Sequence, residues 1–93
     1  MPAAVPEPTR QFASNVQRAM AERGLTVSEV ADRAELSLNH VNLILEGRRK
    51  VQLDTLVKLA GALDVAPEQL LDGVEWISDG QGGGEFRARD PGA

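Results

Sequence analysis

Three polar side chains, followed closely by three cations, have the residue types and spacing that suit a groove lined by phosphates. Asn39, His40 and Asn42 fall on the outward face of a short predicted helix, and the cationic run 48–50 follows it directly. Amide and imidazole groups can hydrogen-bond to the edges of bases, while cations bind phosphates. Nucleic acid is therefore the leading candidate partner. The plainer interpretation is that each of these side chains is simply solvated on an exposed surface.

The segment that carries these groups predicts two short helices joined by a tight turn. Residues 26–29 have the pattern of a capping box, in which a hydroxyl and a carboxylate three residues apart satisfy backbone N–H groups at a helix start. Ser37 is the predicted N-cap of the following helix, and Glu35 and Leu36 leave room only for a turn. Because helices this short are not stable alone, further helices must cover them.

Apolar residues recur at helical spacing through most of the chain and predict one all-α domain over residues 9–72. The expected helices run from Thr9 as N-cap to about Arg23, from Thr26 to about Ala34, from about Leu38 to Leu45, over the stretch from Leu53 to Leu63, and from Pro67 to a stop at Gly73. Residues 1–8 contain three of the five prolines and are expected to form a flexible N-terminal arm.

The pattern changes in residues 73–93, where a glycine-rich connector separates two short β-compatible segments, 74–77 and 85–88. A hairpin and a disordered tail are both compatible with this pattern. An isolated two-stranded hairpin is marginal in water, so its order is favoured if the strands pair with a second subunit across a two-fold axis. The segment is the candidate dimerisation element, and its candidate interface residues are Trp76, Ile77 and Phe86.

Composition excludes several classes of protein. The 93 residues suffice for one small domain, and the absence of cysteine excludes both a disulfide framework and a cysteine-based metal site. The single histidine and the scattered acids give no support to a metal, a cofactor or an enzyme. No apolar run reaches the roughly 20 residues of a membrane span, and no secretory signal is visible, so a cytoplasmic protein without a membrane partner is expected.

The net charge of −4 is distributed unevenly. Residues 9–64 carry eight Lys or Arg and seven Asp or Glu, which gives +1, whereas the chain from Val65 onward carries six acids and two bases, which gives −4. Glu7 supplies the remaining −1. A local positive surface around the cationic run is therefore compatible with the acidic total.

The order of these elements resembles the Xre-like helix-turn-helix family of the phage lambda and 434 repressors and Cro. The resemblance covers the chain from about Phe12 to Leu71. It implies a five-helix, lambda-repressor-like helix-turn-helix domain, to which the C-terminal segment can add a short β-hairpin. The residues that carry it are Arg23-Gly24-Leu25-Thr26, Glu29-Val30-Ala31, residues 37–42, Glu46-Gly47, and residues 56–65 followed by Leu70-Leu71.

The resemblance also implies what the site residues do: the third helix of the family enters the major groove of double-stranded DNA, and the domain binds as a dimer. The family's base-facing positions fall on Leu38, Asn39, His40, Asn42 and Leu43. Its phosphate-contacting positions fall on Thr26, Ser28, Ser37, Arg48, Arg49 and Lys50.

The resulting hypothesis is a transcriptional regulator, a repressor rather than an activator, that binds a palindromic operator as a homodimer. The alternative is an antitoxin-type protein-binding module that neutralises a toxin partner and autoregulates its operon. Acidic surface after Val65, apolar Leu38 and Leu43, and Val27 where many family members carry Gln all favour the alternative. The operator, the target genes and any inducer are not encoded in these patterns.

Overall fold

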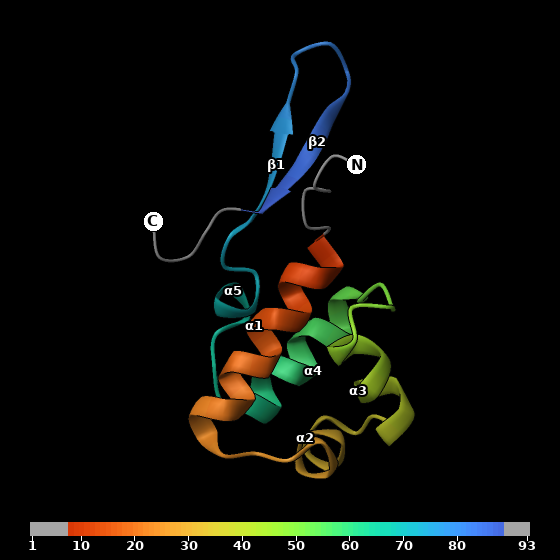
Figure 1. The fold of residues 1–93 in the computed structure, drawn as a ribbon, viewed down its shortest axis with the longest axis vertical. Helices are drawn as coiled ribbons and strands as arrows, with labels where there is room; N and C mark the ends of the chain where they lie inside the picture. Colours follow the sequence, from red (N-terminus) through yellow and green to blue (C-terminus); the bar gives the residue numbers. More distant parts are fainter. Residues whose placement is uncertain (1–7, 89–93) are drawn as a thin grey trace.

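Five helices and one antiparallel hairpin make up residues 8–88, which are the residues that the computed structural model describes (Figure 1). The helices pack into a single body, and the hairpin projects from one end of it (Figure 1). The predicted helical domain with a short C-terminal hairpin is confirmed. Its elements are α1 (Pro8–Arg23), α2 (Val27–Ala34), α3 (Leu38–Leu45), α4 (Leu53–Leu63), α5 (Pro67–Leu70), β1 (Val74–Ser78) and β2 (Gly84–Ala88).

The first helix begins earlier than expected. Pro8 is the first residue of α1, whereas the sequence pattern put the helix start after Thr9. Proline suits the first turn of a helix, because the N–H it lacks has no intrahelical acceptor there. Residues 1–7 of the expected N-terminal arm lie outside the described residues. No helix within the described part of the chain is long and apolar enough to cross a membrane.

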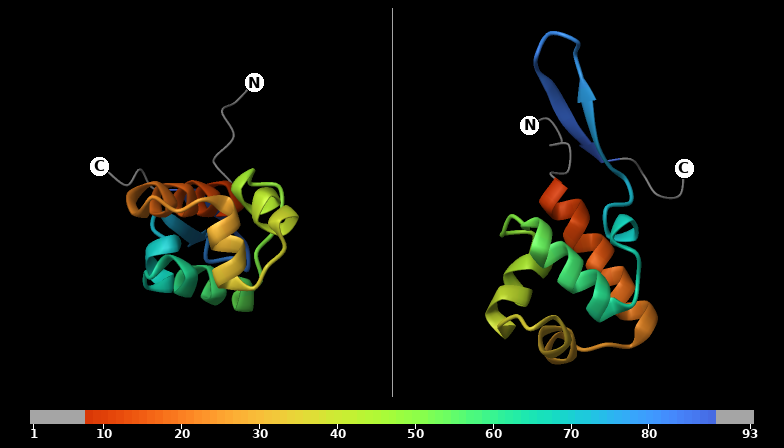
Figure 2. Two further views of the ribbon diagram at one scale, coloured as in Figure 1. Left: turned by 90° about the horizontal axis from the view of Figure 1, so that it is seen from below. Right: turned by 180° about the vertical axis from the view of Figure 1, so that it is seen from behind.

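The core lies between α1 and α4, with α2 crossing from one to the other when the molecule is viewed from below (Figure 2). It is built from aliphatic side chains, and each of the five helices contributes to it. Since α2 and α3 have eight residues each, this packing is what stabilises them. The largest fully buried side chains are Val16, Val30, Val41, Ile44, Leu59, Leu63 and Leu70.

The predicted capping box at the start of α2 is present. The Thr26 hydroxyl oxygen accepts a bond from the Glu29 N–H at 3.1 Å, and Glu29 Oε1 accepts one from the Thr26 N–H at 3.0 Å. The pKa of the Glu29 carboxyl is lowered below its ordinary value, first by the hydrogen bond from the Thr26 backbone, then by the Thr26 side chain, and then by the charge of Arg33. An ionised acceptor therefore stands at the N-terminus of α2, where the helix dipole favours negative charge.

One buried residue of α1, Asn15, is polar and was not predicted from the apolar spacing of this helix. Its side chain is only 2% exposed, and it joins α1 to the chain that leads into the hairpin. Its amide Nδ2 donates to the carbonyl oxygens of Leu70 at 2.8 Å and Asp72 at 2.9 Å. Its Oδ1 accepts from Gln11 Nε2 and Arg18 Nη2, both at 3.1 Å. Both donors and both acceptor positions of the amide are thus used.

We expect Asn15→Ala to lower the free energy of unfolding by about 1–3 kcal/mol, because two carbonyls lose their amide donor in a buried place. Urea denaturation followed by circular dichroism measures this. Ser14→Ala, at the exposed neighbouring position, is the matched control and should change the value by less than about 0.5 kcal/mol. Equal losses for the two variants would contradict the role assigned to Asn15.

Candidate nucleic-acid interface

Helix α3 has a buried side and an exposed side. Val41 and Ile44 are fully buried, while Asn39 and Asn42 are exposed. Residues three apart on a helix lie on the same face, so the two asparagines stand together on the outside of the body. Figure 1 shows α2 and α3 at the end of the helical body away from the hairpin.

The remaining predicted base-contact residues surround these asparagines at different exposures. Leu38, at the first position of α3, is 50% exposed, and Leu43 is half-buried. His40 is also half-buried, because one helical step of about 100° from Asn39 turns it toward the side of Ile44. The structure therefore brings together Asn39, Asn42 and Leu43 and places His40 at the flank of that face.

Ser37 is the N-cap of α3, as predicted, and its Oγ accepts a bond from the His40 N–H at 3.0 Å. Ser37, Thr26 and Ser28 are all exposed. A hydroxyl that accepts one bond can still donate its own hydrogen. The starts of α2 and α3 thus present hydroxyl groups on the surface, of which those of Thr26 and Ser37 also serve as caps.

The cationic loop follows α3 and leads to α4, and Arg48, Arg49 and Lys50 are all exposed. Arg48 Nη1 forms an ion pair with Glu46 Oε2 at 3.5 Å. Both of its side chains are at least half exposed, so this pair is weak and leaves the arginine available to another anion. The loop can therefore offer up to three cations to a phosphate.

The base of this loop is held by a close approach between Gly47 and α1. Gly47 has φ of +70°, and a Cβ at this position would lie 3.3 Å from Cγ and 3.4 Å from Cα of Arg10. Both the left-handed backbone and the short distance favour glycine at this position. The loop is thus positioned by the first turns of α1 as well as by α3.

The end of α3 is joined to α1 by apolar packing and by one side-chain hydrogen bond. Met20 is buried in the core and Leu45 packs against it. Gln17 Nε2 donates to the carbonyl oxygen of Leu45 at 2.6 Å and so satisfies the end of α3.

The candidate dimer residues on the hairpin do not share one face. Trp76 and Phe86 are cross-strand partners, and their rings meet edge to face with centroids 4.9 Å apart. Each is 52% exposed. Ile77 pairs with Glu85 and points to the opposite face, because side chains alternate along a strand.

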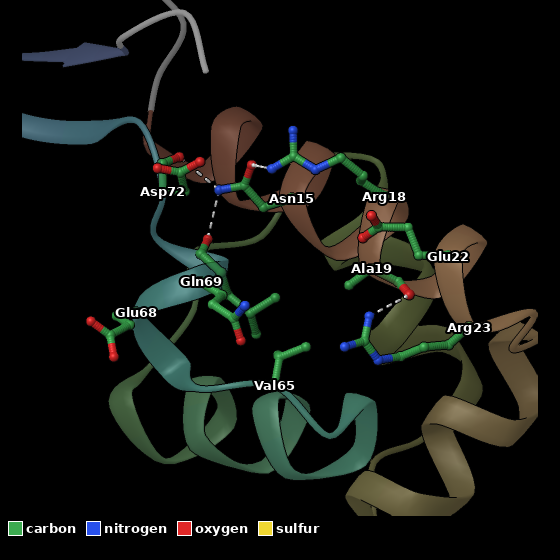
Figure 3. Close-up of a pocket in the computed structure, with 10 residues that line it drawn as sticks. Asn15, Arg18, Ala19, Glu22, Arg23, Val65, Glu68, Gln69 and Asp72 are labelled. Atoms are coloured by element: carbon green, nitrogen blue, oxygen red, sulfur yellow. Dashed lines mark hydrogen bonds between the residues drawn. The ribbon is translucent and has the colours of Figure 1, made fainter. Parts of the chain in front are cut away.

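A polar groove of about 830 Å³ lies between α1 and α5, and sequence reasoning missed it (Figure 3). Arg18, Glu22 and Arg23 come from α1, and Glu68 and Asp72 stand across from them. None of the predicted DNA-contact residues lines this groove. Its charges have both signs, and no group of three or more His, Asp or Glu suited to a metal occurs in the described residues. The sequence feature that could have indicated this groove is Asn15, a polar residue that lies next to the apolar face of α1 and lines the groove.

The arrangement of α2, α3 and the cationic loop can be compared with known families. The Cro/C1-type helix-turn-helix DNA-binding domain matches residues 15–75, which is more than half of the chain. The chain belongs to this family. The resemblance to Xre-like domains is thereby confirmed, and the domain is of a DNA-binding type. The family is not an enzyme class.

Relatives of this Cro/C1-type domain carry names from gene regulation. The transcriptional regulator DdrOP3 of Deinococcus deserti is 34% identical over 58 residues, a match that covers 62% of this chain and 45% of that protein. The chain thus spans less than half the length of this relative. The restriction-modification controller protein C.AhdI from Aeromonas hydrophila is 29% identical, with a TM-score of 0.65 and coverage of 67% of this chain and 94% of that one. The hypothetical transcription factor NHTF from Neisseria is 28% identical, with a TM-score of 0.68 and coverage of 76% and 85%.

Proposed function

We propose that this Cro/C1-type domain is a transcriptional repressor that reads an operator with the exposed face of α3. The observation that carries the proposal is the exposed pair Asn39 and Asn42, on a helix whose other side is fully buried, with exposed cations following at 48–50. The names of the relatives from Deinococcus and Neisseria support a role in transcription.

Each base-facing residue has a chemical role in this proposal. An asparagine amide can bond to N6 and N7 of adenine together, which assigns Asn39 and Asn42 to direct reading of bases. Leu38 and Leu43 would contact thymine methyl groups. His40, at the flank of the face, would reach a backbone phosphate.

The phosphate contacts position the domain and carry no sequence information. We assign them to the hydroxyls of Thr26, Ser28 and Ser37 at the starts of α2 and α3, and to the cations of the loop after α3. Arg49 is central among the three cations, and within the described residues no ion pair occupies it. Its contribution would be electrostatic and therefore dependent on salt.

One domain of this size offers a small DNA interface, so useful affinity requires two copies on half-sites about one helical turn apart. We propose a homodimer on a palindromic operator, with dimer contacts from the hairpin residues Trp76, Ile77 and Phe86. A dimer bound over a promoter would repress by excluding polymerase. A regulator of this kind acts where the chromosome is, which places it in the cytoplasm.

A second candidate function, an antitoxin-type module that binds a protein partner and its own operator, is favoured by Leu38. In this function the Leu38 side chain, which is 50% exposed at the start of α3, would contact a protein partner instead of a thymine methyl group. The antitoxin function requires that a neighbouring gene encodes a protein that co-purifies with the chain and releases it from DNA. A repressor without a toxin partner does not require such a protein.

Asn39→Ala should reduce the preference for the operator over a scrambled duplex by about 1–3 kcal/mol, because one bidentate contact to adenine is lost. Fragments selected from genomic DNA supply the operator, and fluorescence anisotropy measures both affinities. Affinity for the scrambled duplex is the internal control and should stay unchanged. A preference that is the same in both proteins would remove Asn39 from base reading.

Arg49→Ala should weaken binding to every duplex alike and reduce the slope of log Kobs against log salt by about 0.9, the value expected for one lost phosphate contact. The matched control is Lys58→Ala, which removes an exposed cation from α4. We expect the control to keep the wild-type slope. A slope unaltered by Arg49→Ala would exclude a phosphate contact at this position.

Shortening the chain after Gly73 removes both strands and keeps all five helices. We expect the shortened chain to sediment as a monomer at concentrations where the full chain is a dimer, because the proposed interface is gone. Circular dichroism checks that the helices remain. A dimer of undiminished strength would assign the interface to the helical body.

A further inference from the structure

Exposed apolar side chains gather at the hairpin end of the molecule. Within residues 8–88 six large apolar side chains are exposed, and only Leu38 belongs to α3. Scattered exposed apolar residues are ordinary in a monomer, whereas a continuous group indicates an interaction surface. The other five are Leu53, Val57, Leu71, Trp76 and Phe86.

Two of these residues line an apolar groove of about 320 Å³ below the hairpin. Leu53 at the start of α4 and Leu71 after α5 form part of its wall, together with Phe12, Leu56 and Val74. Leu53 is 75% exposed, although it stands at the edge of a groove lined mainly by carbon. Val57 lies one helical turn farther along α4 and extends the same surface.

The hairpin carries an edge-to-face pair of aromatic rings that continues from this groove. Val74, Trp76 and Phe86 share one face of the hairpin, because cross-strand partners and alternate residues point to the same side. A Cβ at Gly84 would stand 2.7 Å from Cζ2 and 2.8 Å from Cε2 of Trp76, so the indole lies directly over that glycine. The two rings are therefore held in place before any partner arrives, with about half of each exposed.

We propose that the aromatic pair of one copy docks into the apolar groove of a second copy, and that the second copy returns the same contact about a two-fold axis. This inference rests on the proposed homodimer and names the surface that receives the hairpin. In this arrangement the two copies associate by docking one face of each hairpin into the other copy's groove, and not by pairing the edge strands of their hairpins. We name the surface formed by the groove, Val57 and the aromatic pair the exchange surface.

A second copy fits this surface because projection and groove belong to the same chain. One two-fold operation makes both contacts at once, which closes the assembly at two copies. Figures 1 and 2 place the hairpin at the opposite end from α2, so docking at the hairpin end leaves the outer face of α3 open to DNA.

Charge complementarity also favours a second copy. Residues 74–88 carry Glu75, Asp79 and Glu85 against Arg87, which makes the hairpin acidic. Arg48 and Lys50 line the neighbouring groove beside Phe86. An acidic hairpin approaching this end of another copy is therefore attracted, and attraction of this kind orients association without requiring direct ion pairs.

The test compares full-length variants by sedimentation equilibrium. Trp76→Ser removes the docked ring and Leu53→Ser opens the groove wall, and each should raise the dimer Kd at least about tenfold. Gln81→Ala, at the exposed hairpin connector, is the control and should leave the Kd unchanged. Leu53 is too exposed to support the core, and Phe86→Ser replaces Trp76→Ser if the latter lowers helical content. A wild-type chain that stays monomeric, or variants that dimerise like the wild type, would overturn the inference.

Mixing the two variants tests the exchange itself. In a mixed pair, the intact rings of the Leu53→Ser chain meet the intact groove of the Trp76→Ser chain, so one of the two contacts is restored. Because residues in contact are energetically coupled, the mixed pair should be at least about fivefold tighter than either variant alone, a larger gain than the factor of about two that statistics give any mixed pair. Labelling one variant with a fluorophore allows the mixed Kd to be measured. Absence of any gain beyond the statistical factor would overturn the docking.

A titration with a single operator half-site at low salt keeps this inference separate from the proposed function. Both variants should bind the half-site as tightly as one wild-type copy does. A wild-type chain that binds the half-site but stays monomeric in sedimentation would overturn the docking and leave the DNA-reading proposal intact. A dimer that shows the mixed-variant gain but binds no DNA would overturn the DNA-reading proposal and leave the docking intact.

Discussion

The structure depends on the burial of two helices that are too short to be stable alone. Isolated helices below about 12–15 residues are marginal in water, and α2 and α3 have eight each. Their apolar sides are removed from water by α1 and α4, and for α3 this means complete burial of Val41 and Ile44. Once one side of such a two-turn helix is buried, its polar residues can lie only on the opposite, exposed side. The outward placement of Asn39 and Asn42 therefore follows from packing, and the α3 face stays well defined only while the core is intact.

A second constraint, of a different physical kind, sets the position of the hairpin. The link between α5 and β1 is held by the amide of Asn15, which reaches two backbone carbonyls more than 50 residues away. An apolar side chain of similar size would fill the space and leave both carbonyls without this donor. Beyond this link, Trp76 and Phe86 are each about half exposed. The hairpin is thereby attached and still able to offer an apolar face.

Most of the helical body was predictable because its signals are local. Apolar spacing located α4, and Thr26 and Ser37 marked the starts of α2 and α3 through bonds that span only three residues. Contacts between distant segments were not predictable. Asn15 lies outside the apolar spacing of α1 and bonds to carbonyls more than 50 residues away, and the groove between α1 and α5 could not be anticipated from either helix. The opposite faces of Trp76 and Ile77, by contrast, follow from the alternation of side chains along a strand, which is a local property.

The acidic total of the chain is compatible with DNA binding because the charges are separated in space. The molecule is 43 Å long, and Asp79 lies in the connector of the hairpin, which projects at the end opposite α2. Screening at 0.1 M salt acts over about 10 Å, so this charge contributes little to the potential at the exposed face of α3. The cationic loop stands between the two ends. Arg48 and Lys50 share a groove with Phe86, whereas Arg49 does not line it. Attraction to the acidic hairpin of a second copy would therefore act mainly on the outer two cations, which leaves Arg49 as the cation most fully available to phosphate.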